Sequence, residues 1–374
     1  MKHLKEFKQA VNSPLEYARQ LKKDSSKKVV GYVCSYTPEE IILAAGAHPV
    51  RLFGTKENIG LADSHLQSYC CSVVRGILEE GLSGKTDTLD GMVFPHTCDS
   101  IQRLSDIWRM NIGFGFHLDV ILPVKLDTDS ARDYMADVLT KFRKDIGGAL
   151  KADVTDANLI KAITIMNVIR QSIRSIYEMR SLNPRLMSGE DLYTLVRASM
   201  IMDRERVAEL LLETIAELQA KADKVKQGKP LKRLVLAGGI CNHPGIYPTI
   251  EEGVGAVVWD DFCTGARYFS EIINDGADPL SRIAGRLIHR VVCPAKHIDL
   301  DGRARHLIRL VQEQNAQGVI FLLLKFCDPH AFDYPYIKQS LDEAGIPVML
   351  MEINDPISSG GQMKTRVEAF LEML

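Results

Sequence analysis

The sequence lacks the features that would tie it to a membrane or to nucleic acid. A membrane-spanning helix needs about 20 apolar residues, but the most apolar run, 318–324, stops at Lys325. The formal net charge is −2, so no basic excess points to a nucleic-acid partner. Residues 1–28 are rich in lysine and lack the apolar stretch of a signal peptide. We therefore expect a cytoplasmic protein without a membrane or nucleic-acid partner.

Complete nucleotide and structural zinc motifs are missing as well. Residues 81–86 resemble the end of a phosphate-binding loop, but Glu79 stands where its first glycine is required. Any ATP-driven step would therefore need a second protein to hydrolyse the ATP. No two cysteines are spaced as Cys-x-x-Cys, the pair that structural zinc sites usually contain.

The chain is long enough for more than one domain, with 374 residues, 46% of them hydrophobic and 25% charged. Strand-like runs alternate with helical stretches near both ends, which predicts parallel sheets with helices on their faces. The fold class that we expect is α/β, with two similar four-strand, flavodoxin-like lobes joined by a helical section. The predicted strands are 29–34, 49–53, 91–95 and 120–124 in the first lobe, and 233–237, 256–259, 318–324 and 347–352 in the second.

The change in residue pattern along the chain predicts four segments. These are an N-terminal helical segment at 1–28, a first α/β lobe at 29–130, a helical section at 131–230 and a second α/β lobe at 231–374. Within the first lobe, residues 37–40 look like a helix start. Thr37 would be the N-cap, Pro38 the first helical residue, and Glu40 would complete a capping box.

The placement of the cysteines indicates a shared site. They are eight in number, at 34, 70, 71, 98, 241, 263, 293 and 327, and reduced thiols are expected in the cytoplasm. Five follow directly after predicted strands, where parallel sheets place their ligands: Cys34, Cys98, Cys241, Cys263 and Cys327. We expect them to meet in the cleft between the lobes. Spacing alone leaves an iron–sulfur cluster and zinc both open.

Several strings are similar to the 2-hydroxyacyl-CoA dehydratase and benzoyl-CoA reductase family, and the likeness covers nearly the whole chain. The Pro-His-Thr-Cys-Asp and Lys-Phe-Cys-Asp-Pro strings are the most specific. The matching segments are 31–40, 71–75, 94–99, 260–268 and 325–335.

The resemblance implies an iron–sulfur cluster held by Cys71, Cys98 and Cys327, with one iron position left for substrate, water or sulfide. Cys70 is the alternative to Cys71, but the Cys-x-x-x-Arg register favours Cys71. The resemblance also implies a homodimeric, ATP-hydrolysing iron–sulfur activator that supplies one low-potential electron.

Extra cysteines separate this chain from typical dehydratase subunits. Cys34, Cys241 and Cys263 bring the set to six, which resembles the branch of homodimeric reductases with a double-cubane [8Fe-9S] cluster. Cys293 is expected to be structural, although the choice among Cys241, Cys263 and Cys293 stays open. Arg75, Arg103 and Arg267 follow cysteines, and each either faces the cluster or an anionic substrate, or lies on a solvated face.

The leading hypothesis is an oxygen-sensitive, anaerobic, ATP-dependent (through its partner) iron–sulfur reductase that acts on small molecules. One alternative is a [4Fe-4S] subunit of a heterodimeric 2-hydroxyacyl-CoA dehydratase or benzoyl-CoA reductase with an acyl-CoA substrate. A further alternative is a non-catalytic electron-transfer or zinc scaffold protein.

Overall fold

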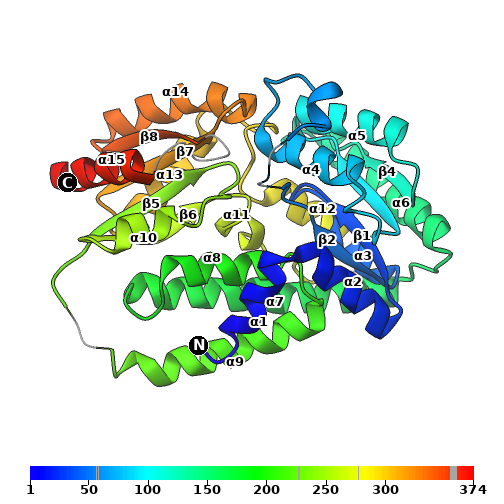
Figure 1. The fold of residues 1–374 in the computed structure, drawn as a ribbon, viewed down its shortest axis with the longest axis horizontal. Coiled ribbons are helices and arrows are strands. Elements are labelled where there is room, and N and C mark those ends of the chain that lie inside the picture. Colours follow the sequence, from blue (N-terminus) through cyan, green and yellow to red (C-terminus); the bar gives the residue numbers. More distant parts are fainter. Residues whose placement is uncertain (56, 58, 226–227, 277, 354–359) are drawn as a thin grey trace.

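The computed structural model describes residues 1–55, 57, 59–225, 228–276, 278–353 and 360–374. It contains two 4-stranded sheets, ordered β2-β1-β3-β4 and β6-β5-β7-β8, in which every strand pair is parallel. The predicted α/β fold with two similar lobes is thus confirmed (Figure 1). The strands are β1 (Lys28–Tyr32), β2 (Ala47–Arg51), β3 (Gly91–Pro95), β4 (Phe116–Val120), β5 (Lys232–Gly238), β6 (Gly255–Asp261), β7 (Gly318–Leu324) and β8 (Val348–Ile353).

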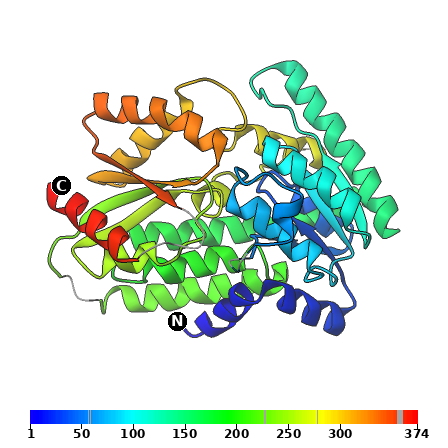
Figure 2. The ribbon, with the colours of Figure 1, turned by 45° about the horizontal axis from the view of Figure 1, so that its top comes forward.

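Helices cover the sheets and form a separate layer beneath both of them, seen in green in Figures 1 and 2. They are α1 (Leu4–Asn12), α2 (Pro14–Ser25), α3 (Glu39–Ala44), η1 (Ala62–Ser64), α4 (Ser72–Leu82), α5 (Asp99–Asn111), α6 (Asp129–Leu150), α7 (Asp156–Leu182), α8 (Gly189–Ala198), α9 (Arg204–Ala222), α10 (Ile246–Glu251), α11 (Ala266–Phe269), α12 (Pro279–His289), α13 (Gly302–Glu313), α14 (Asp328–Glu343) and α15 (Gly360–Met373). The methionines at 187, 200 and 202 lie in the core of the lower layer.

Both sheets are buried on both faces because their apolar residues alternate between two cores. In β1, Val29 packs towards α4 and α5, whereas Val30 packs towards α3 and α6. In β5, Leu234 and Val235 divide in the same way between the α10 side and the α13 side. Covering both faces leaves the carboxyl ends of the strands as the open edge of each sheet, where a site can form.

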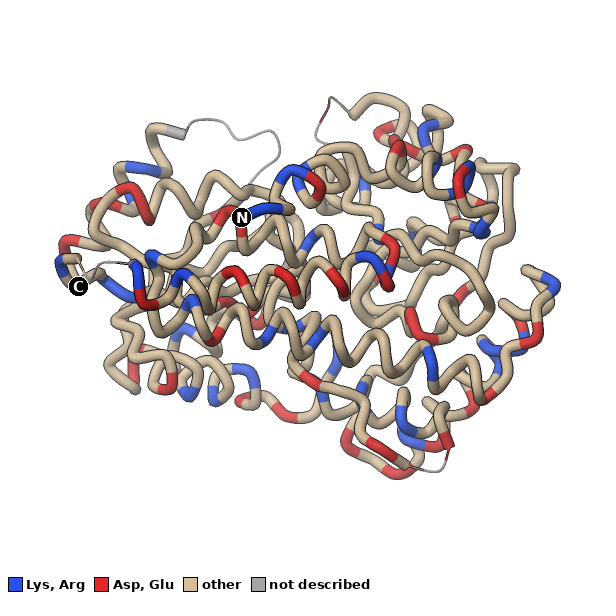
Figure 3. Tube along the Cα trace, turned by 90° about the horizontal axis from the view of Figure 1, so that it is seen from below, with Lys and Arg blue, Asp and Glu red and all other residues tan. Residues whose placement is uncertain are grey.

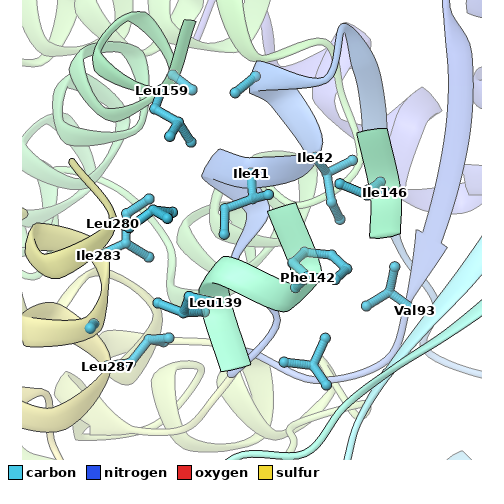
Figure 4. Packing of buried hydrophobic residues seen from close by; sticks show 14 of the residues in the cluster. Ile41, Ile42, Val93, Leu139, Phe142, Ile146, Leu159, Leu280, Ile283 and Leu287 are labelled. Carbon is cyan, nitrogen blue, oxygen red and sulfur yellow. The ribbon is translucent and has the colours of Figure 1, made fainter. Parts of the chain in front are cut away.

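Helix α12 comes from the second half of the chain but packs into the core of the first lobe. Its Leu280, Ile283 and Leu287 meet Leu139 of α6 and Ile41 of α3 (Figure 4). The chain therefore crosses from one lobe to the other and back between β6 and β7. This crossing holds the two open edges together.

The fourth strand lies at Phe116–Val120, before the range that we predicted, so that prediction was wrong by four residues. Pro123 has no backbone N–H to donate, and Ile121 and Val124 are 52% and 55% exposed. The prediction relied on apolar residues, but β4 is an edge strand whose residues before Val120 are only half-buried. An apolar run therefore does not mark its position.

The predicted capping box at residues 37–40 is also wrong. Helix α3 starts at Glu39, its N-cap position is Pro38, and the buried Thr37 hydroxyl makes no hydrogen bond within the described residues. Glu40 instead forms a buried ion pair with Arg170 of α7, and Glu39 pairs with Arg204 at the start of α9 at 2.6 Å. Burial opposes ionisation of Glu40, but the nearby Arg170 outweighs it and lowers the pKa of Glu40. These pairs fix α3 to the lower helical layer.

Charge on the outside of the molecule is mixed. Lys and Arg positions are interspersed with Asp and Glu positions along the long helices of the lower layer (Figure 3). Among the described helices, none combines the length and the apolar character that crossing a bilayer takes.

The Glu40–Arg170 pair gives a test of the corrected α3 start. Gln can replace Glu in a capping box, but Glu40→Gln would leave the Arg170 charge buried without a partner. We expect it to lower the free energy of unfolding by about 3–5 kcal/mol, measured by urea denaturation. As a control, Glu209→Gln removes an exposed pair with Arg206 and should cost less than about 1 kcal/mol. Equal, small effects of both variants would contradict the buried pair.

Candidate functional site

The open edges of the two sheets bring cysteines from both lobes together. Cys34 follows β1 and Cys98 follows β3 in the first lobe, while Cys263 follows β6 and Cys327 follows β7 in the second. The edges face one another, and a cavity of about 1080 Å³ lies between them. Its wall includes Cys98 and Asp99 from the first lobe and Asp328 from the second.

The thiols are close enough to act on one another electrostatically. Burial raises the pKa of Cys98 well above its ordinary value, and the charges of Cys71, Cys34 and Cys327 raise it further. Burial likewise raises the pKa of Cys327, with Cys71, Cys293 and Cys263 adding to it. Thiolates in this place would repel each other, so they need a cation or a metal to stabilise them.

Cys293, which we expected to be structural, lies beside these thiols. It stands in the loop between α12 and α13, and burial raises the pKa of its thiol, with Cys34 among the charges that add to this. Its N–H donates to the Tyr36 hydroxyl at 3.4 Å, just beyond Cys34. The Thr97 hydroxyl donates to the Cys34 sulfur at 3.6 Å.

Six cysteines are half-buried, and we call them the cleft cysteines: Cys34, Cys71, Cys98, Cys263, Cys293 and Cys327. Cys70, which is buried, also acts on one of them, because its charge adds to the raised pKa of Cys71.

The other two cysteines are buried within single lobes. Cys70 packs in the core of the first lobe and is 3% exposed. Cys241 is 2% exposed and packs with Tyr247 in the core of the second lobe, where its N–H donates to the Thr264 hydroxyl at 3.1 Å.

Three cleft cysteines stand immediately before helices. Cys71, Cys98 and Cys327 are the N-cap residues of α4, α5 and α14, and none of them makes a side-chain capping hydrogen bond. Burial raises the pKa of Cys71 to about 11, although first-turn N–H groups of α4 counteract this. The first-turn N–H groups and the helix dipole favour negative charge at each of these positions.

The other three cleft cysteines have cationic side chains beside them. Arg51 is 1% exposed, and it donates to the Cys263 carbonyl at 3.0 Å and to the Cys263 sulfur at 3.6 Å. Lys296 is 2% exposed and donates to the Leu122 carbonyl at 3.1 Å. Burial lowers the pKa of Lys296, while Cys34, Cys293 and Cys98 act in the opposite direction. Arg290, also buried, donates to the Ser35 carbonyl at 2.6 Å, next to Cys34.

The three arginines that follow cysteines in the sequence lie in different environments. Arg75 pairs with Asp63, and Arg103 pairs with Asp99 at 2.6 Å in an exposed position, so both lie on solvated faces. Arg267 is 1% exposed, lines the cavity and lies 3.4 Å from Asp261.

The histidines near the cysteines have protein partners of their own. His96 pairs with Asp119 at 2.9 Å, and His330 is buried 3.5 Å from an Arg267 nitrogen. His243 is buried in the second lobe, 7% exposed.

Arg51, Arg290 and Lys296 were not found from the sequence. Arg51 ends strand β2, Arg290 follows α12, and Lys296 lies in a loop. No motif marks them, because the fold brings them to the thiols from distant parts of the chain. Closeness in sequence to Cys293 would have given a signal for Arg290 and Lys296, each three residues away, but none for Arg51.

The cleft thiols are not arranged to bind one metal ion together. Within the described residues, no three His, Cys, Asp or Glu side chains are close enough to hold one metal ion. The cleft thiols instead come from both sheets, and buried cations and helix starts lie beside them. Thiolates of a cluster attach to different irons, and hydrogen bonds to sulfur stabilise such clusters. These residues therefore fit an iron–sulfur cluster.

Known relatives are components of dehydratases and a reductase. The (R)-phenyllactyl-CoA dehydratase beta subunit of Clostridium sporogenes is 26% identical, covering 100% of this chain and 99% of the relative. A benzoyl-CoA reductase subunit of Thauera aromatica is 28% identical, covering 93% and 90%. The beta subunit of (R)-2-hydroxyglutaryl-CoA dehydratase from Acidaminococcus fermentans is 26% identical, covering 99% and 98%.

The family model described as "2-hydroxyglutaryl-CoA dehydratase, D-component" matches residues 34–374. This range includes every strand except β1 and all the cleft cysteines. The resemblance inferred from the cysteine strings is thereby confirmed, and the chain belongs to the 2-hydroxyglutaryl-CoA dehydratase D-component family.

Proposed function

We propose that this protein is the catalytic component of an ATP-dependent reductase and reduces small molecules at a double-cubane [8Fe-9S] cluster. The observation that carries the proposal is the convergence of the cleft cysteines from both lobes. One cubane of the kind that the family resemblance implies needs three thiolates, and three further thiols lie within electrostatic reach of them.

The proposed ligands are the cleft cysteines. This set keeps Cys34, Cys71, Cys98, Cys263 and Cys327 from the sequence prediction and takes Cys293 in place of Cys241. Cys293 is favoured because its charge raises the pKa of Cys327, and the charge of Cys34 raises the pKa of Cys293. Cys241 is disfavoured because it packs among Tyr193 and Tyr247 in the core of the second lobe. Cys70 is disfavoured against Cys71 by its burial in the first lobe.

The cluster would supply low-potential electrons to a bound substrate. The chain's own residues bind and shield it: helix starts at Cys71, Cys98 and Cys327 and the cations beside the remaining thiols balance its negative charge. Substrate would approach through the cavity, where Cys98 reaches the wall. The electron would come from a separate, ATP-hydrolysing iron–sulfur activator, since the sequence contains no complete nucleotide motif of its own.

A second candidate is a dehydratase or benzoyl-CoA reductase subunit with one [4Fe-4S] cluster on Cys71, Cys98 and Cys327. The names of the relatives favour it, since they are single subunits of such enzymes. It leaves Cys34, Cys263 and Cys293 without a role, which is why we place it second. A zinc or electron-transfer scaffold is the remaining alternative.

Metal analysis of the anaerobically purified chain tests the proposal. We expect about eight irons and nine sulfides per chain, because two cubanes share one bridging sulfide. A value near four irons would favour the dehydratase-type subunit instead. Zinc without acid-labile sulfide would overturn both.

Single substitutions distinguish the proposed ligands from the buried cysteines. We expect Cys293→Ser to lower bound iron well below the wild-type value, because it removes a thiolate from the cluster. Cys70→Ser and Cys241→Ser are matched controls that should keep the full iron content, measured colorimetrically and by the visible absorption of the cluster. If Cys241→Ser loses iron and Cys293→Ser keeps it, Cys241 is the ligand, as the sequence predicted.

A further inference from the structure

The cleft cysteines lie beside two different sources of positive charge, helix N-termini and side-chain cations. Cys71, Cys98 and Cys327 are N-cap residues, so backbone dipoles serve them. Cys34, Cys263 and Cys293 are not N-cap residues but have buried side-chain cations nearby, and we call them the cation-side cysteines. One of these cations, Lys296, also lies within electrostatic reach of Cys98. A helix end carries about half an elementary charge, whereas a guanidinium carries a full one that is never lost in proteins.

Arg51 is a buried cation that contacts the sulfur of a cation-side cysteine. Its guanidinium donates to the Cys263 carbonyl at 3.0 Å, to the Cys263 sulfur at 3.6 Å and to the Met200 sulfur at 3.3 Å. No carboxylate of a described residue is among its hydrogen-bond partners, and its Nε makes no hydrogen bond. A fully buried guanidinium without a carboxylate is costly unless another anion balances it.

Arg290 is a second buried cation, and it contacts Ser35, the residue after Cys34. Its donors go to the Ser35 carbonyl and hydroxyl and to the Arg267 carbonyl at 2.7 Å, and its guanidinium lies over the Tyr36 ring. In the part of the chain that the structure describes, these partners again include no carboxylate. Arg51 therefore borders Cys263, and Arg290 borders the residue after Cys34, so both positive charges lie close to whatever the cation-side thiols hold.

The cleft cysteines differ in their access to the cavity. Among the described residues that form its wall, Cys98 is the only cleft cysteine, although Asp328, next to Cys327, and Val292 and Pro294, next to Cys293, belong to the wall too. A substrate in the cavity would therefore meet Cys98 directly, with the side chains of Arg290 and Lys296 in the same wall.

We propose that Arg51 and Arg290 are positioning residues that make the two halves of the cluster unequal, so that the first electron rests on the half held by Cys34, Cys263 and Cys293. This inference rests on the proposed double-cubane function. The activator would lose one electron and the half held by Cys34, Cys263 and Cys293 would gain it, with no bond made and no proton taken up. Nearby positive charge favours the reduced state, which carries one more negative charge.

Reductive titration with titanium(III) citrate, followed by electron paramagnetic resonance, tests this. Wild-type protein should show two reduction steps at different potentials. Arg51→Met should make the first step at least about tenfold less favourable, a shift of about 59 mV to lower potential for one electron. Arg51→Lys should restore most of it, because the charge returns. Arg290→Met supplies a second reading if Arg51→Met does not retain its cluster.

Arg197→Met is the matched control. Arg197 is buried and lies over the same Phe53 ring as Arg51, but it donates to the Tyr193 hydroxyl and the Asn242 side chain. It should leave both steps unchanged.

The possible results separate the two proposals. Eight irons per chain would support the proposed function. If the two reduction steps then had equal potentials, or if Arg51→Met and Arg290→Met shifted both steps by the same amount, only the inequality of the halves would be overturned. Four irons in wild-type protein would overturn the proposed function and this inference with it.

Discussion

Charge balance in the space between the two sheets is the constraint on which the rest of the site depends. Burial raises the pKa of Cys98 and Cys327, and each thiolate repels its neighbours. Yet Arg51 and Arg290 are buried nearby without a carboxylate among their described hydrogen-bond partners. Thiols ionised on a metal cluster would supply the negative charge that these cations lack. The cations would in turn stabilise the ionised thiols.

The fold meets this constraint through ordinary features of parallel sheets. Carboxyl ends of strands give way to loops and then to helix starts, so Cys98 and Cys327 each precede a helix. Helix α12 crosses into the first lobe and returns the chain through Cys293. The buried pairs of Glu39 and Glu40 fix α3, just beyond Cys34, to the lower helical layer. Each lobe contributes thiols, so the relative position of the lobes becomes part of the site.

The sequence was sufficient for much of the fold, because alternating apolar residues and helical periodicity are local properties. It failed at β4, where an edge strand is only half-buried, and at Glu40, where a distant arginine replaced a local cap. Cysteine placement after strands pointed to a shared site, but could not separate Cys241 from Cys293. That choice depends on which loop turns inward, and Cys293 follows a crossing helix that no short-range pattern indicates. The cations Arg51 and Arg290 come together only in three dimensions.

The most direct test of the account is the position of iron in a crystal of the anaerobically purified protein, from anomalous scattering at the iron edge. We expect two adjacent iron peaks between the lobes, one within bonding reach of Cys71, Cys98 and Cys327 and the other of Cys34, Cys263 and Cys293. A single peak confined to the first group, or iron bound at Cys241, would contradict it.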